Sequence, residues 1–272
     1  MKTAAIVQAR YASTRLPGKI LKALPYGGSE TALHQVIKRL RRCVMLDEVI
    51  IATTDHPEDD AVAALCEEAG VSFFRGSMDD VLSRYYGAAN KFGVDVVVRV
   101  TSDCPCIDSD IIDDMLRKFE NADYMSNVHP RIFPHGLDAE VFTFEALKKA
   151  HEEAEAKHER EHVTPYIING GFRKMSYQPS VCGGAEIRIT LDRPEDYAAL
   201  CAVYDSLYKE NEFFGYAEIM RLFREKRWIG IINENVVQKK VYENINDEID
   251  AGVSMLRLQE LHRAADILDE NR

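Results

Sequence analysis

The fold is indicated most clearly by residues 94–103, which read VDVVVRVTSD. Residues 94–100 are mostly apolar and β-branched on both faces of the predicted strand, so other parts of the chain must cover both faces. Such strands are typical of a parallel sheet with helices on each side. The polar residues Thr101, Ser102 and Asp103 follow directly. Because ligands bind beyond the carboxyl ends of strands in such sheets, these residues lie at a candidate functional position.

The same pattern extends outward from this strand through the first 120 residues. The predicted strands cover residues 4–9, 48–53, 71–74 and 94–100. The predicted helices cover residues 31–43, 58–69, 79–92 and 109–119. The alternation predicts an α/β fold with a parallel sheet. The loops after the four strands, which begin near Arg10, Thr54, Arg75 and Thr101, are where we expect ligand-binding residues.

After Asp123 the pattern is less regular. We expect strands at residues 141–144 and 186–191, helices at 145–161 and 195–210, and mostly helical structure from Glu218 onward. No repeat or obvious linker separates these parts. The economical interpretation is a main domain of residues 1–215 with a helical C-terminal appendage of residues 216–272.

The composition is that of a soluble globular protein and excludes several classes of function. The 272 residues carry a formal net charge of −11, which argues against nucleic acid as the main partner. No apolar stretch approaches the roughly 18 residues of a membrane span, and the apolar run at the N-terminus is too short for a signal peptide. The six cysteines are scattered, with no disulfide or zinc spacing. We therefore expect a cytoplasmic protein that does not bind a membrane.

A basic loop contrasts with this acidic balance. The first 29 residues hold no acidic residue but five cations, Lys2, Arg10, Arg15, Lys19 and Lys22. Three of them lie in QARYASTRLPGK, residues 8–19, directly after the first predicted strand. Convergent cations and hydroxyls on an irregular backbone suit a triphosphate, although a solvated basic loop is the alternative. The loop lacks the glycine patterns of P-loop enzymes and of Rossmann dehydrogenases.

Carboxylates follow two other predicted strands. Asp103 could hold Mg²⁺, which takes one or two carboxylates together with phosphate oxygens. Asp192, in IRITLDRPEDY, could complete that site, or it could only cap the helix that follows. Asp108 and Asp110 could be the metal-binding D-x-D pair of a glycosyltransferase. We favour a helix cap for this pair, because apolar helical residues follow it directly.

Residues 158–162, HEREH, match the zinc metalloprotease pattern H-E-x-x-H. The flanking residues are strongly polar, and no third ligand follows at the metzincin spacing. We therefore interpret these histidines as a solvated or substrate-facing helix edge.

Several segments, spread over about residues 4–200, resemble one enzyme family. QARYASTRLPGK resembles the N-terminal signature of sugar-acid cytidylyltransferases, which make CMP-activated sialic acid and 3-deoxy-manno-octulosonate (KDO). Other segments look like the SpsF-type branch, named for spore-coat polysaccharide synthesis: FRGSMDDVLSRYY (74–86), RVTSDCPCID (99–108), HGLDAEVF (135–142), EREHVTPY (159–166) and TLDRPEDY (190–197).

The resemblance implies a three-layer α/β/α nucleotide-diphospho-sugar transferase fold, which is Rossmann-like and GT-A-like, with a mostly parallel sheet. It implies the Mg²⁺-dependent reaction of CTP with a sugar acid, giving a CMP-sugar and pyrophosphate for surface polysaccharide synthesis, in a homodimer. The residues it implies for the CTP phosphates are Arg10, Ser13, Arg15 and Lys19, of which Arg10, Arg15 and Lys19 would be catalytic. Other nucleotide-binding residues would be Gln8, Ala9, Arg75, Gly76 and Ser77.

The resemblance also implies that Asp103 and Asp192 hold Mg²⁺. Five further residues would lie on the acceptor side or at a dimer contact: Gly136, Leu137, Asp138, Glu161 and His162. The chain has TSDCP at residues 101–105 where KDO enzymes carry a QGDEP-like stretch, so the acceptor stays open. Two alternative functions are a glycosyltransferase that uses Asp108 and Asp110, and a non-catalytic nucleotide-binding protein.

Overall fold

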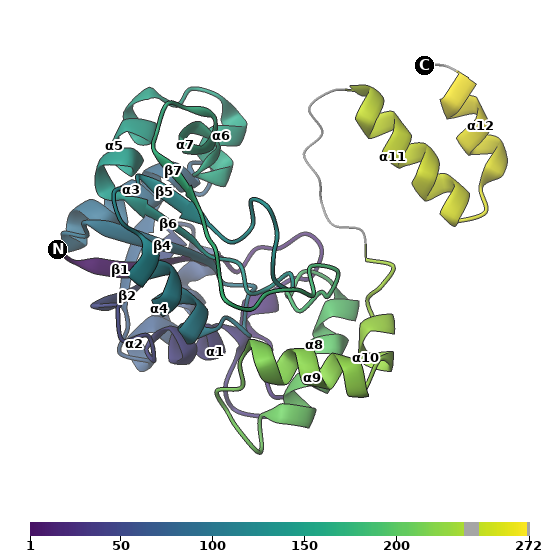
Figure 1. The fold of residues 1–272 in the computed structure, drawn as a ribbon, viewed down its shortest axis with the longest axis horizontal. Helices are drawn as coiled ribbons and strands as arrows, with labels where there is room; N and C mark the ends of the chain where they lie inside the picture. The colour runs from purple at the N-terminus through teal and green to yellow at the C-terminus, as the bar shows by residue number, and fades with distance from the viewer. Residues whose placement is uncertain (237–244, 271–272) are drawn as a thin grey trace. The chain divides into compact units, whose positions relative to one another are not determined.

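A seven-stranded sheet forms the centre of residues 1–235 (Figure 1). The computed structural model describes residues 1–236 and 245–270. The strand order is β3–β2–β1–β4–β6–β5–β7. The bounds are β1 Thr3–Gln8, β2 Glu48–Thr54, β3 Ser72–Gly76, β4 Val96–Thr101, β5 Tyr124–Ser126, β6 Glu140–Thr143 and β7 Lys174–Ser176. Strands β1 to β4 are parallel, and β6 is antiparallel to both of its neighbours, so the prediction of a mostly parallel sheet is confirmed.

Helices cover both faces of this sheet. Their bounds are α1 Ala32–Leu40, α2 Asp60–Glu68, α3 Val81–Phe92, α4 Ser109–Lys118, α5 Phe144–Glu153, α6 Lys157–His162, α7 Pro165–Asn169, α8 Pro194–Leu207, α9 Tyr216–Glu225 and α10 Trp228–Ile231. Short 3₁₀ helices are η1 Lys19–Leu21 and η2 Pro57–Asp59.

Alternation along β1 produces two separate cores. Ala5 and Val7 pack with α1, α2, α4 and α8, whereas Ala4 and Ile6 pack with α3, α5 and α7. Successive side chains of a strand point to opposite faces, so an apolar strand needs a helical layer on each side. This is the predicted three-layer α/β/α arrangement.

Two of the predicted elements are wrong in detail. Residues 186–191 do not form a strand, because their partners are loops: Ile189 N donates to His135 O at 2.8 Å and Leu191 N donates to Asp103 O at 2.8 Å. The predicted helix 145–161 is broken into α5 and α6. The Arg160 guanidinium donates to His151 O and Ala154 O at the end of α5, which satisfies carbonyls that a longer helix would use. The strands β5 and β7, of three residues each, were not predicted.

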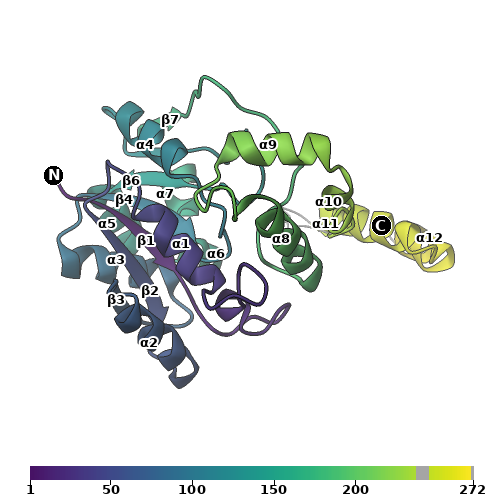
Figure 2. The same cartoon turned by 90° about the horizontal axis from the view of Figure 1, so that it is seen from below.

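The first unit extends past the predicted boundary at residues 215/216. Helices α9 and α10 pack with α8, and Figure 2 shows the three side by side. Their buried residues Ile219, Leu222 and Ile229 belong to the same core as Leu200 and Val203 of α8. The two units therefore divide after Asn235.

The second unit, residues 236–272, contains α11 Ile245–Leu258 and α12 His262–Glu270. Val253 and Ala265 are its buried residues among those described. The helical content agrees with the prediction for this part of the chain. Within residues 1–236 and 245–270, no helix is both long enough and apolar enough to cross a membrane.

Candidate active site

The basic loop after β1 places Lys19 by three local devices. Gly18 adopts a left-handed conformation with φ of +63°, and its N–H donates to Tyr11 O at 3.3 Å, which closes the loop. A Cβ at position 18 would lie 3.2 Å from the Tyr11 ring, so glycine also avoids a close contact. Directly afterwards, Ile20 is fully buried in η1. Its neighbour Lys19 is thereby held at the end of the sheet.

Lys19 joins the two predicted metal carboxylates. Its Nζ lies 2.8 Å from Asp103 Oδ2 and 2.7 Å from Asp192 Oδ1. Arg15 Nη2 lies 3.3 Å from the same Asp192 oxygen. The loops after β4 and before α8 are themselves connected, because Thr190 Oγ1 donates to Asp103 O at 3.0 Å. Four predicted residues from three distant parts of the sequence thus form one charged cluster.

The charges in this cluster fix one another. Burial by itself would raise the pKa of Asp103, but the Lys19 ammonium outweighs it and lowers that pKa to about 2. Burial would likewise lower the pKa of Lys19, yet Asp103 and Asp192 hold it above its ordinary value. At neutral pH the lysine is therefore a cation beside an ionised Asp103.

A second group of polar residues adjoins Asp192, and sequence reasoning missed most of it. Arg188 Nη2 lies 3.5 Å from Asp192 Oδ2, and its Nη1 lies 3.1 Å from His135 Nδ1. Burial lowers the pKa of His135, which favours the neutral ring. Asp138, predicted on the acceptor side or at a dimer contact, accepts two hydrogen bonds from Arg131 at 2.5 and 2.9 Å. The position of Arg188, four residues before Asp192, is the signal that could have identified it.

Other residues predicted to bind the nucleotide lie on β1 and the loop that follows. Gln8 is half-buried, and its Oε1 accepts from Arg99 Nη2 at 3.2 Å. Ala9 is buried, and Arg10 is exposed. Ser13 Oγ accepts from Leu16 N at 3.3 Å, so its hydroxyl oxygen supports the loop.

The remaining predicted nucleotide residues, Arg75, Gly76 and Ser77, lie at the end of β3. The Arg75 guanidinium donates to Thr54 O at 2.8 Å and pairs with Asp60 at 2.7 Å. Burial lowers the pKa of Arg84, and the positive charge of Arg10 lowers it as well. Arg84 Nη1 donates a hydrogen bond to Ser77 O at 3.0 Å. Ser77 therefore accepts a hydrogen bond from Arg84, and the charge of Arg10 acts on the same guanidinium.

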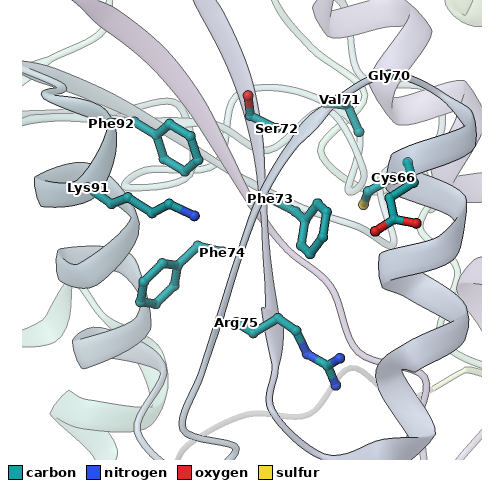
Figure 3. Close-up of a pocket in the computed structure, with 10 residues that line it drawn as sticks. Cys66, Gly70, Val71, Ser72, Phe73, Phe74, Arg75, Lys91 and Phe92 are labelled. Atoms are coloured by element: carbon teal, nitrogen blue, oxygen red, sulfur yellow. The ribbon is translucent and has the colours of Figure 1, made fainter.

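A hollow of about 640 Å³ lies along β3 at the outer edge of the sheet, and Figure 3 shows the residues that line it. Phe73, Phe74 and Phe92 supply aromatic side chains to it, and Lys91 lies at its α3 side. Of the predicted site residues, Arg75 alone lines this hollow, and the Lys19 cluster contributes nothing to its lining. The hollow is therefore a surface feature separate from the charged cluster.

The Asp108–Asp110 pair is a helix cap, as predicted. Asp108 is the N-cap of α4, where its Oδ1 accepts from Asp110 N at 2.8 Å. Its Oδ2 accepts from Tyr216 N at 2.7 Å, which also supports the start of α9. Both oxygens thus bind backbone N–H groups.

The close cysteine pair, Cys104 and Cys106, lies in the interior of the fold. All six cysteines are free thiols, and Cys104 and Cys106 are buried on either side of Pro105. Burial raises the pKa of Cys106 to about 12 and that of Cys104 well above its usual range. Neither thiol is therefore ionised at neutral pH.

Phosphate-compatible cations beside two carboxylates, at the end of a mostly parallel sheet, define a nucleotidyltransferase. Comparison with known proteins identifies the family: residues 4–172 match the family model described as cytidylyltransferase. The chain belongs to this family.

Relatives extend the match over most of the chain. It is 38% identical over 250 residues to the protein MJ1063 of Methanocaldococcus jannaschii, covering 89% of this chain and 99% of the relative. It is 32% identical to the spore coat polysaccharide biosynthesis protein SpsF of Bacillus subtilis, covering 73% of this chain and 85% of that protein. The solved structure of a cytidylyltransferase from Leptospira borgpetersenii has a TM-score of 0.79 at 32% identity, covering 89% of this chain and all of the other. These matches confirm the resemblance and the fold class.

Proposed function

We propose that this enzyme transfers CMP from CTP to a sugar acid or a related acceptor, with Mg²⁺, in the synthesis of a surface polysaccharide. The observation that carries the proposal is the Lys19 ammonium bonded to both Asp103 and Asp192, beside Arg15. The similarity to SpsF and the RYASTRLPGK segment support the pathway and the acid acceptor. A cytoplasmic homodimer belongs to the same proposal, by analogy with the family.

The two carboxylates suit Mg²⁺. Within residues 1–236 and 245–270, no three His, Cys, Asp or Glu side chains gather into a cage that could hold a metal. Mg²⁺ needs no such cage, because it binds one or two carboxylates and takes its other ligands from phosphate and water. Asp103 Oδ1 lies 3.8 Å from Cys104 Sγ and Asp192 Oδ2 lies 3.5 Å from Arg188 Nη2, and a carboxylate has about four lone-pair sites, so each side chain can bind a cation besides its present partners. When bound, the metal would neutralise charge on the phosphates.

The cationic side chains supply the rest of the electrostatic stabilisation. The acceptor hydroxyl oxygen forms a bond to the α-phosphorus, the bond to the bridging oxygen breaks, and pyrophosphate leaves with the electron pair. In this proposal Arg10, Arg15 and Lys19 supply positive charges that neutralise the leaving group. The hydroxyl proton passes to water. Chemistry of this kind depends on positioning and charge more than on a covalent catalyst.

Calorimetric titration with CTP, UTP and ATP, each with and without Mg²⁺, tests the proposal. We expect Mg²⁺-dependent binding that prefers CTP, weakened on the order of 10-fold or more in Lys19→Ala, because a hydrogen bond to a charged group contributes about 1.5–3 kcal/mol. Arg10→Ala should weaken it as well. With a panel of sugar acids, the enzyme should then release pyrophosphate.

Paired variants test the metal residues. Asp103→Ala should abolish metal-dependent CTP binding, whereas Asp110→Ala, on the exposed side of the α4 cap, should preserve it. Preference for an intact UDP- or GDP-sugar, with loss of activity only on changing Asp108 and Asp110, would instead identify a glycosyltransferase. CTP binding without turnover on any acceptor tried would favour a non-catalytic protein.

A further inference from the structure

We propose that Asn233, in the turn that follows α10, is a positioning residue for Asp192. It acts through the buried carboxylate of Asp196 and through Arg188. The inference rests on the proposed function of Asp192 as a magnesium ligand. It assigns to the C-terminal helices of the first unit a role in the reaction that the sequence motifs do not suggest.

Asp196 is the centre of this arrangement. It is fully buried in the first turn of α8 and accepts five hydrogen bonds. Its Oδ2 accepts from the backbone N–H groups of Asp192 and Arg193, both at 3.0 Å, and from Arg188 Nη2 at 2.8 Å. Its Oδ1 accepts from Arg188 Nε at 2.7 Å and from Asn233 Nδ2 at 2.9 Å. The Asp196 carboxylate therefore fixes the backbone at Asp192, and the side chains of Arg188 and Asn233 in turn fix the Asp196 carboxylate.

Burial disfavours the ionised form of Asp196, and the hydrogen bonds that it accepts favour that form. Burial by itself would raise the pKa of Asp196, but hydrogen bonds from Arg188 and Asn233 keep the pKa below its ordinary value. An ionised carboxylate without exposure to water depends on each of its donors, because the loss of one leaves charge uncompensated. Asn233 is one of these donors.

Asn233 also connects the two ends of the Asp192 loop. Its Nδ2 donates to Arg188 O at 3.1 Å as well as to Asp196 Oδ1, which uses both amide hydrogens. Arg188 lies four residues before Asp192, and Asp196 lies four residues after it. A single side chain thus bridges the segment that presents Asp192, and Arg188 Nη2 contacts the Asp192 carboxylate itself at 3.5 Å.

Helix α10, which packs beside α8, positions Asn233 next to Asp196. Ile229 of α10 is fully buried, four residues before Asn233, and Figure 2 shows α10 beside α8. Asn233 itself is 4% exposed. Its neighbour Asn235 is exposed and so provides a matched control in the same turn.

The test measures metal affinity and does not depend on turnover. Mn²⁺ replaces Mg²⁺, and the electron paramagnetic resonance signal of free Mn²⁺ is followed during titration of the full chain without nucleotide, because CTP itself chelates Mn²⁺. In Asn233→Ala we expect Mn²⁺ to bind about 10–100-fold more weakly, the range found when a residue that orients a metal ligand is removed. Asn233→Asp, which places a second carboxylate against Asp196, should weaken binding further. Asn235→Ala should match the unchanged chain.

The melting temperature, measured beside Mn²⁺ affinity, separates positioning from general damage. A purely structural role would lower the melting temperature of Asn233→Ala and leave Mn²⁺ affinity intact at temperatures well below melting. That result overturns the inference. If Asn233→Ala does not fold by circular dichroism, Asn233→Ser retains one donor and is the variant measured, with the same expectation. If the unchanged chain binds CTP without any metal dependence, the proposed function itself fails and the inference fails with it.

Discussion

Lys19 illustrates how one side chain can organise a site. Its ammonium bonds to two carboxylates that would otherwise repel each other, and it is 13% exposed. The lowered pKa of Asp103 follows mainly from this interaction, which outweighs the opposing effect of burial. Removal of the lysine leaves two partly buried carboxylates uncompensated.

The pH dependence of stability follows from these shifts. Asp103 titrates at about 2 in the folded protein, against an ordinary 3.8, so its contribution is complete above pH 3.8 and is lost as pH falls toward 2. The raised pKa of Lys19 contributes below its ordinary 10.5 and is lost only at higher pH. We expect Lys19→Met to lower the free energy of unfolding on the order of 1–2 kcal/mol at pH 7, and less near pH 2.

Urea unfolding of the unchanged protein and of Lys19→Met, at pH 7 and near pH 2, measures the difference in their free energies of unfolding. Lys22→Met is the control, because Lys22 lies in the same segment and outside the charged cluster. An equal difference at the two pH values would show that Lys19 does not stabilise the ionised form of Asp103.

At the scale of the element, Asp108 connects the first turns of two helices. It caps α4 and accepts from the first N–H of α9. We expect Asp108→Ala to destabilise the protein by about 0.5–2 kcal/mol, the range for loss of an N-cap, while metal-dependent CTP binding persists. Thermal unfolding with calorimetric titration of CTP checks both parts, with Asp110→Ala as the exposed control. A stable Asp108→Ala protein that no longer binds CTP would contradict the cap interpretation.

The sequence predicted strands and helices correctly where the apolar pattern was long. It failed where the structure of a segment depends on contacts with residues distant in the sequence. The mostly apolar residues 94–100 were predicted as a strand, and β4 forms at Val96–Thr101. Residues 186–191 have the same local pattern, but they lie against loops at His135 and Asp103 and form no ladder. The break between α5 and α6 depends on Arg160 folding back on His151 O, a contact that local sequence does not encode.

The residues of the candidate site likewise divide into those that the sequence predicted and those that only the structure shows. The motifs predicted Lys19, Asp103 and Asp192, because charged residues after apolar segments are visible in the sequence. They did not predict Asn233, which lies in a turn with no recognisable pattern and 37 residues from Asp196. Its role depends on the packing of α10 against α8, which only the three-dimensional structure provides.

At the scale of the whole molecule, the division after Asn235 makes a prediction about truncation. A chain of residues 1–235 retains every residue of the charged cluster and the helices that pack on α8. We expect it to fold and to bind CTP like the full chain. A chain of residues 1–215 loses the buried Ile219, Leu222 and Ile229, and we expect it to unfold or aggregate, because loss of a single large core side chain already costs about 2–5 kcal/mol.

Circular dichroism and calorimetric titration compare the two truncated chains with the full protein. Failure of the 1–235 chain to fold would show that the second unit stabilises the first. A stable, CTP-binding 1–215 chain would restore the boundary at 215/216.

The bonds made by Lys19 span 84 and 173 positions of the chain. Contacts between such remote positions form late, because long loops must close first. An incompletely folded chain therefore lacks the Lys19 cluster, and CTP bound there as proposed would bind the folded unit alone. By mass action such binding would stabilise the folded unit as a whole, so that cellular CTP would affect how long the protein survives as well as how fast it works.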